Sequence, residues 1–207
     1  MAGTVGIAAT AGKRAGTPEK IVREHKIERL IVACPGCYYD LGKILRGSGV
    51  IIQTVYEVLD FGNGKRNDGR RCAVHDSCPD RVAGLFGSQV RTLLEQSGFT
   101  TVEMLHSKAN TICCGSGGQL SHFRPDLVDE LVEQRHAEFQ QTDADILAGY
   151  CMSCVLKYDA MLPSIPVTHA LNLLLELEPD YSGVKERARR MFERPDGEKL
   201  WEEVMAD

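Results

Sequence analysis

Five cysteines are the residues of this sequence best suited to chemistry. Cys78 is separated by 34 residues from the adjacent pair Cys113–Cys114, and 36 residues separate that pair from Cys151, with Cys154 three positions beyond. A mononuclear zinc site normally takes four ligands, so five thiols exceed its needs. Adjacent side chains also point apart, which suits a site that holds several metal atoms. Iron–sulfur clusters present several irons to cysteine thiolates, so the spacing indicates an iron–sulfur site.

The composition favours metal ligation over disulfide bonding. The chain has 207 residues, of which 43% are hydrophobic and 26% charged, and its formal net charge is -5. This acidic balance argues against a nucleic-acid-binding protein. No apolar run approaches the ~20 residues of a transmembrane segment, and the first residues lack the order of a secretory signal. We therefore expect a cytoplasmic protein, in whose reducing surroundings eight cysteines serve as metal ligands or redox groups.

Alternating apolar runs and amphipathic segments predict the elements that hold these cysteines. Short apolar runs predict strands, the first two of them buried, at residues 30–33, 50–52, 72–75, 101–105, 146–148 and 165–167. Helices are predicted between them, including one that begins at Pro79 and a long one that begins at Pro125. Strands that alternate with helices are typical of an α/β fold with parallel sheets.

An internal likeness divides the chain into regions. Residues 28–59 resemble residues 145–173, because in each a strand reaches a C-x-x-C that is followed by helix, strand and helix. The first C-x-x-C is Cys34/Cys37 and the second is Cys151/Cys154, but only the second has further cysteines before it. We expect parallel-sheet α/β lobes from a duplicated cysteine-rich repeat. The expected regions are an incomplete first repeat at 1–61, a linker at 62–71, a complete repeat at 72–180 and a charged helical tail at 181–207.

The cysteine pattern resembles that of the cysteine-rich CCG-domain family, typified by the B subunit of heterodisulfide reductase. The family spacing is C-x31–39-CC-x35–36-C-x2-C, and every interval here agrees with it. The flanking residues agree too, since residues 75–78 read H-D-S-C and residues 113–118 read C-C-G-S-G-G. The resemblance covers about residues 25–178. It extends to iron–sulfur subunits of anaerobic glycerol-3-phosphate dehydrogenase, glycolate oxidase and lactate-utilisation systems.

This resemblance implies a cofactor and partners. In the heterodisulfide reductase relatives, a complete motif holds a noncubane [4Fe-4S] cluster that cleaves a disulfide. By resemblance, the ligands of one such cluster here are Cys78, Cys113, Cys114, Cys151 and Cys154. The implied role is that of an oxidoreductase component that reduces a small-molecule disulfide with electrons from a flavoprotein or a ferredoxin-like iron–sulfur subunit. The alternative is an electron-transfer subunit, with an indirect electron donor, of a flavin-linked hydroxy-acid or glycerol-phosphate dehydrogenase.

Residues beside the cysteines could assist the chemistry. Because glycine has no Cβ, Gly115, Gly117 and Gly118 would let backbone N–H groups approach the sulfurs. Helix N-termini expected at Cys78 and Cys151 would stabilise thiolates. Five thiolates on one cluster would leave one of them a candidate labile ligand, and we expect Cys78, Cys113 and Cys114 to be catalytic. His75 is either a proton donor or a residue that orients the loop by hydrogen bonds.

Two questions stay open from the sequence. Zinc could occupy four of the five cysteines and would make the domain a structural interaction module. Cys34 and Cys37 could complete a site with a partner, form a disulfide, or be a relic without metal. Cys72 has no place in the motif, and on a predicted buried strand it is expected to be a core residue.

Overall fold

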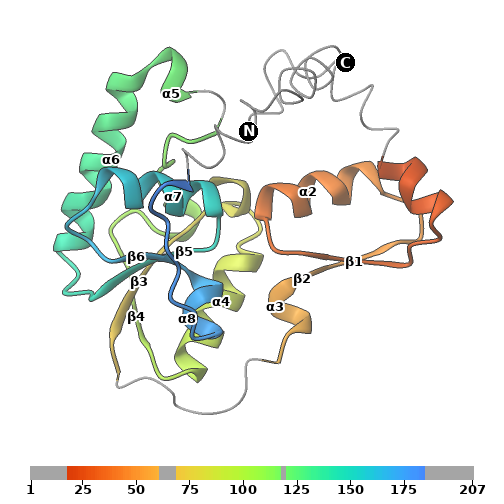
Figure 1. Cartoon of the computed structure of the whole chain (residues 1–207), viewed down its shortest axis with the longest axis horizontal. Coiled ribbons are helices and arrows are strands. Elements are labelled where there is room, and N and C mark those ends of the chain that lie inside the picture. Colours follow the sequence, from red (N-terminus) through yellow and green to blue (C-terminus); the bar gives the residue numbers. More distant parts are fainter. Residues whose placement is uncertain (1–17, 61–68, 118–119, 185–207) are drawn as a thin grey trace.

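The computed structural model describes residues 18–60, 69–117 and 120–184, and it contains two parallel sheets within them (Figure 1). One sheet pairs β1 (Arg29–Val32) with β2 (Ile51–Thr54). The other has the strand order β4-β3-β5-β6. Its strands are β3 (Arg71–His75), β4 (Thr100–Val102), β5 (Ile146–Gly149) and β6 (Val167–His169). The predicted α/β class with parallel sheets is confirmed.

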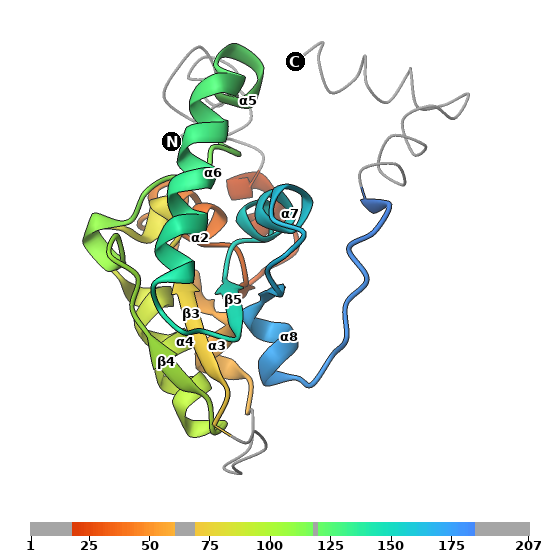
Figure 2. The same ribbon diagram turned by 90° about the vertical axis from the view of Figure 1, so that its left-hand side faces the viewer.

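The four-stranded sheet is the middle of three layers (Figure 2). Because side chains alternate along a strand, Cys72 and Val74 of β3 face one side and Ala73 faces the other. Helices α4 (Leu85–Gln96) and α8 (Ala170–Leu174) pack on the first face. On the second face lie α6 (Pro125–Gln140) and α7 (Met152–Met161). Cys72 is fully buried in the first core, as expected.

The carboxyl ends of the central strands meet at one edge of this sheet. Strands β3 and β5 are parallel, with His75 opposite Gly149. Cys78 follows β3 and Cys151 follows β5, so the parallel pairing alone brings two distant cysteine segments together. Functional groups of α/β sheets gather at this edge.

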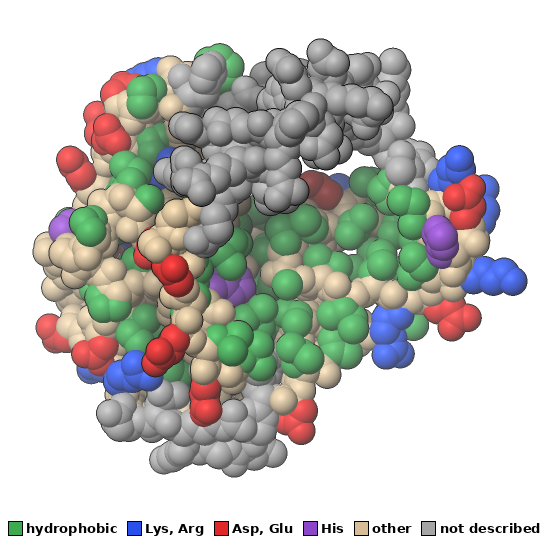
Figure 3. All heavy atoms as spheres, in the orientation of Figure 1, with side chains coloured by type: hydrophobic (Ala, Val, Ile, Leu, Met, Phe, Trp, Pro, Cys, Tyr) green, Lys and Arg blue, Asp and Glu red, His purple; other side chains and the backbone are tan. Residues whose placement is uncertain are grey.

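The segment before the four-stranded sheet forms a smaller unit. It contains a helix over 18–24, β1, α2 (Pro35–Ile44), β2 and α3 (Val55–Val58). The prediction that its strands are buried is wrong, since Ile31 is 56% and Ile51 54% exposed. Two strands are too few to make a sheet with both faces covered. Figure 3 shows hydrophobic side chains gathered over this unit.

The two C-x-x-C segments are locally alike. Cys34 is the N-cap of the ten-residue helix α2, and Cys151 is the N-cap of the ten-residue helix α7. Each helix lies between two paired parallel strands. The likeness is one of local structure, and a duplicated origin stays a prediction. Of the expected linker, residues 62–68 lie outside the described part, while Arg71 belongs to β3. Of the expected helical tail, residues 185–207 also lie outside it.

Helix α4 begins later than predicted. Instead of an α-helix from Pro79, the chain forms a short 3-10 helix, η2 (Cys78–Asp80), and α4 begins only at Leu85. The cause is Gly84, whose φ of 64° places it in the left-handed region and separates the two helices. Val82, an apolar residue that the expected helix would have included, is consequently 98% exposed.

Candidate metal centre

The structure brings the five cysteines of the motif into one chain of neighbouring thiols. Cys78 starts η2, the pair Cys113–Cys114 lies in the loop after the 3-10 helix η3 (Lys108–Asn110), and Cys151 and Cys154 begin α7. The sulfurs of Cys114 and Cys154 are 3.0 Å apart. Thiol hydrogen bonds join Cys78 to Cys113, Cys113 to Cys114, and Cys151 to Cys154. All five thiols therefore belong to one site.

Because these thiols lie so close together, their pKa values are shifted in opposite directions. Hydrogen bonds from the thiols of Cys114 and Cys78 lower the pKa of Cys113 to about 2. The Cys154 thiol likewise lowers the pKa of Cys151 to about 5, although burial opposes it. The other three pKa values are raised, because these thiols lie beside neighbours that already carry the charge. The site thus holds two thiolates, and only added positive charge would let all five sulfurs ionise.

The glycines after the cysteine pair differ in role. Gly115 has a φ of 77°, and its N–H donates to Cys113 Sγ at 3.3 Å, as the sequence suggested. A β-carbon there would lie 2.8 Å from Val128 Cγ2 on α6, so α6 leaves room only for glycine. Gly117 lies in open space, and the described residues show no hydrogen bond from it to a sulfur. Gly118 lies outside the described residues.

The expectation about helix N-termini is half right. Cys151 caps α7, where the N–H of Cys154 also helps to lower the pKa of the Cys151 thiol. Cys78 is instead the first residue of η2, whose N-cap is Ser77. A three-residue helix has little dipole to offer, so the charge state of Cys78 depends on Cys113.

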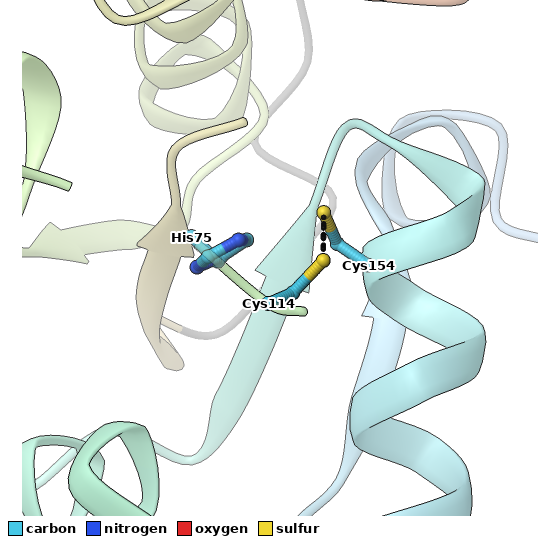
Figure 4. A group of neighbouring side chains, drawn as sticks. All are labelled: His75, Cys114 and Cys154. Atoms are coloured by element: carbon cyan, nitrogen blue, oxygen red, sulfur yellow. Dashed lines mark hydrogen bonds between the residues drawn. The ribbon is translucent and has the colours of Figure 1, made fainter. Parts of the chain in front are cut away.

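His75 lies against the sulfurs at the end of β3 (Figure 4). One of its ring nitrogens is within 4.8 Å of the sulfurs of Cys114 and Cys154. Its Nδ1 is 3.5 Å from the hydroxyl of Tyr158, and its Nε2 is buried without a hydrogen-bond partner among the described residues. Burial, and next the positive charge of Arg135, lower the pKa of His75 to about 3. The imidazole is therefore neutral in this structure.

Comparison with known proteins identifies the segment that carries the site. Residues 72–158 match the family described as the cysteine-rich domain CCG. These residues are a CCG domain. They contain all five cysteines, together with β3, β5 and α7. The unit that carries Cys34 and Cys37 lies before the matched segment.

Longer similarities connect the chain distantly to two groups of proteins. It is 28% identical to the D subunit of dihydromethanophenazine:CoB–CoM heterodisulfide reductase from Methanosarcina barkeri over 165 residues, 72% of this chain and 40% of that protein. The same component of the Methanosarcina mazei enzyme is 27% identical over 76% of this chain and 42% of its own length. Lactate utilization protein A 1 of Bacillus mycoides is 29% identical over 60% of this chain and 51% of its own length. The matched region thus spans about half or less of these relatives. In the part of the chain that the structure describes, no helix is long and apolar enough to cross a membrane.

A buried arginine that the sequence analysis did not single out acts on His75 and on Tyr158 by its charge. Arg135 of α6 is fully buried, and it donates to Glu138 Oε2 at 3.0 Å and to the carbonyl of His106 at 3.0 Å. The sequence could have indicated that Arg135 is buried, because it shares one face of the helix with Val128, Val132 and Phe139, which are all apolar.

A second buried arginine fixes the loop that leads to the cysteine pair. Arg91 of α4 holds both carboxylate oxygens of Asp76 at 2.8 Å. Asp76 also accepts from the backbone N–H of Lys108 at 2.6 Å, and its carbonyl accepts from the Thr111 hydroxyl at 2.8 Å. The network ties the end of β3 to the turn before Cys113. It therefore fixes Cys78 and Cys113 relative to each other.

The donor set of the CCG domain fits a metal centre larger than one ion. Zinc–sulfur bonds of ~2.3 Å bring the sulfurs of a four-cysteine zinc site to within about 4 Å of each other. Within the described residues, only one set of three possible metal ligands has all its ligand atoms within 4.8 Å of one another, and it consists of His75, Cys114 and Cys154. The five thiols instead follow one another as a longer series of neighbours, an arrangement that suits a cluster of several irons.

Proposed function

We propose that this chain is an iron–sulfur subunit of an oxidoreductase of the heterodisulfide reductase type. The ligands would be the five cysteines of the CCG domain, and the cofactor a [4Fe-4S] cluster, noncubane by resemblance. The observation that carries the proposal is the continuous chain of five thiols, two of which have lowered pKa values. The Methanosarcina relatives are named as the D subunit of a heterodisulfide reductase, whereas the cysteine motif resembles the B subunit, so the proposal does not depend on which of the two this chain resembles more.

The residues around the thiols would prepare the site for this cofactor. A bound cluster would supply single electrons and an iron that can exchange a thiol ligand. Cys113 and Cys151 would bind first, because they already hold negative charge. Arg135, whose positive charge already acts on His75, would balance part of the charge of the loaded site. We propose that Cys78, Cys113 and Cys114 are the catalytic cysteines and that one of the five ligands is labile.

His75 is proposed to direct a ring N–H at a sulfur. A neutral imidazole carries one N–H. If Nδ1 of His75 accepts a hydrogen bond from the Tyr158 hydroxyl, the ring hydrogen lies on Nε2, which has no hydrogen-bond partner among the described residues. One ring nitrogen of His75 lies within 4.8 Å of the sulfurs of Cys114 and Cys154, so its N–H could donate to a sulfur of the loaded site. His75→Asn should shift the reduction potential of the loaded site while iron content is kept. An unchanged potential would assign His75 to packing alone.

Partners are part of the proposal. Glycine-rich dinucleotide motifs are absent from the sequence, so electrons would come from a flavoprotein or a ferredoxin-like iron–sulfur subunit. The terminal acceptor would be a small-molecule disulfide. A loaded chain that cycles between redox states but never turns over a disulfide with an artificial one-electron donor would instead be an electron-transfer subunit.

The decisive experiment is anaerobic purification followed by iron, acid-labile sulfide and visible-absorption measurements. The proposal predicts a brown protein with about four irons per chain and equal sulfide. The group of His75, Cys114 and Cys154 favours one alternative, a zinc site in a structural interaction module. About one zinc, no sulfide and no visible band after anaerobic reconstitution would establish that alternative and contradict the cluster.

A further inference from the structure

The C-x-x-C before the CCG domain differs from the buried one in its surroundings. Cys34 and Cys37 are both exposed. Cys154, in the corresponding place of the second C-x-x-C, is 2% exposed and lies 3.0 Å from Cys114. Within the described residues, neither Cys34 nor Cys37 belongs to a group of three possible metal ligands. The sequence before residue 34 contains no cysteine.

The two thiols are arranged to react with each other. Cys34 is the N-cap of α2, Pro35 begins the helix, and the N–H of Cys37 donates to Cys34 Sγ at 3.5 Å. The Cys37 thiol also donates to Cys34, and this hydrogen bond, with burial next, raises the pKa of Cys37 to about 11. The Cys37 thiol therefore keeps its proton at neutral pH. A C-x-x-C at a helix N-terminus is the arrangement that favours redox-active cysteines.

The pair also lies at the edge of the candidate metal centre. A β-carbon built on Gly36 would be 3.9 Å from Cys34 Sγ and 3.9 Å from Pro79 Cγ, and Pro79 directly follows Cys78. Helix α2 packs against η2 at this point, and Figure 1 shows its first turn directed at the CCG domain. The Tyr39 hydroxyl donates to the buried carboxylate of Asp80, which fixes the contact. The dithiol is held in place there.

We propose that Cys34 and Cys37 form a redox-active dithiol that exchanges with a small-molecule disulfide. The Cys34 thiolate attacks one sulfur of R–S–S–R′, the S–S bond of that disulfide breaks, and R′–S⁻ leaves and takes a proton. Cys37 then loses its proton and attacks Cys34 Sγ, which releases R–S⁻. One dithiol and one disulfide become one protein disulfide and two thiols. Two electrons pass from the protein to the substrate, and a dithiol such as dithiothreitol reverses the exchange.

The test uses the full chain, both metal-free and iron-loaded, in glutathione buffers of increasing oxidised fraction. After acid quenching and alkylation, peptide mapping should find a Cys34–Cys37 disulfide in both forms, removed by dithiothreitol. The Cys37→Ser variant should trap one glutathione on Cys34, and limiting iodoacetamide should label wild-type Cys34 at least tenfold over Cys37. Cys72→Ala, which leaves the pair intact, should behave as the wild type.

Three results would overturn the proposal. The first is that neither the disulfide nor the trapped glutathione forms at any buffer ratio. The second is that iodoacetamide labels Cys37 before Cys34, which would reverse the order of attack. The third is that a metal, released by a chelator, protects both thiols from alkylation. Because the same disulfide is measured in metal-free protein, the result tests the dithiol proposal independently of the proposed iron–sulfur function.

Discussion

At the scale of single residues, the distinction among the buried cysteines is the sharpest. Cys154 and Cys72 are both almost fully buried, but Cys154 contacts another thiol and Cys72 lies in an apolar core. We expect Cys154→Ser to lose at least half of the iron and of the visible absorption after anaerobic reconstitution. Cys72→Ala should keep both and lower the free energy of unfolding by about 1 kcal/mol, the cost of a small cavity. Equal iron loss in the two variants would contradict the assigned ligand set.

Glu103 gives a prediction with a defined pH dependence. Its carboxylate accepts from Arg91 Nε at 2.7 Å and from Arg91 Nη2 at 2.9 Å, and the same guanidinium donates to Asp76. Burial alone would raise the pKa of Glu103, but Arg91 outweighs it and the pKa falls below its usual 4.5. Glu103→Gln should lower the free energy of unfolding by about 1 kcal/mol at pH 7, a modest value because the side chain is 38% exposed. A carboxylate whose pKa is lower in the folded state stabilises that state at pH values above its unfolded pKa, and this stabilisation is lost as the pH falls. The difference in free energy of unfolding between the wild type and Glu103→Gln should therefore shrink below about pH 4.5. Urea unfolding of both proteins at pH 7 and at pH 3 measures this difference, and Glu19→Gln, at an exposed position, is the control. An undiminished difference at pH 3 would contradict the ion pair between Glu103 and Arg91.

Some of these residues were predictable from the sequence and some were not. The spacing of the five cysteines requires several strand ends to converge, and parallel pairing of β3 and β5 brings them together. The role of Arg135 was missed because helical charges usually face solvent, although its apolar stripe carried the signal. Nothing local in the sequence indicates that Arg91 pairs with Asp76, since that contact joins α4 to the end of β3.

At the scale of elements, the turn after the cysteine pair depends on one glycine. Gly115 combines a φ of 77° with the close approach of Val128. Gly115→Ala should lower the free energy of unfolding by roughly 1–3 kcal/mol, from strain and the clash, and should broaden the visible spectrum of the loaded site. Gly117→Ala, two residues on in open space, should change stability by less than about 0.5 kcal/mol. Urea unfolding of the two variants makes the comparison, and equal effects would show that the glycines act only through flexibility.

Element boundaries were predicted less well than element order. The helix expected from Pro79 begins at Leu85 because the sign of φ at Gly84 cannot be read from the sequence. The strands at 30–33 and 50–52 were found at nearly the expected positions, but their burial was wrong. An apolar run predicts a strand, whereas its burial depends on how many strands and helices join the sheet, which is decided by distant segments.

At the scale of the whole molecule, the candidate metal centre joins three separate segments of the chain. Cys78 follows β3, Cys113 and Cys114 follow η3, and Cys151 and Cys154 begin α7. A cofactor that binds all three segments only in the folded state must stabilise that state, because its binding energy adds to the folding energy. Thiols of the unfolded chain do not present the same arrangement. Metal loading and global stability should therefore be coupled.

We expect anaerobic loading with iron and sulfide to raise the thermal midpoint of unfolding by at least 5 °C. At ~2–4 °C per kcal/mol for a chain of this size, this is a stabilisation of about 1–3 kcal/mol. Hydrogen exchange should slow most in residues 105–117 and 150–154. Residues 29–58, which carry none of the five cysteines, are the internal control and should change little. An unchanged midpoint, or protection confined to residues 29–58, would mean that the metal does not bridge the three segments. Because chelation reverses loading, return of the midpoint after iron removal would show that the stabilisation comes from the bound cofactor rather than from oxidation of the thiols.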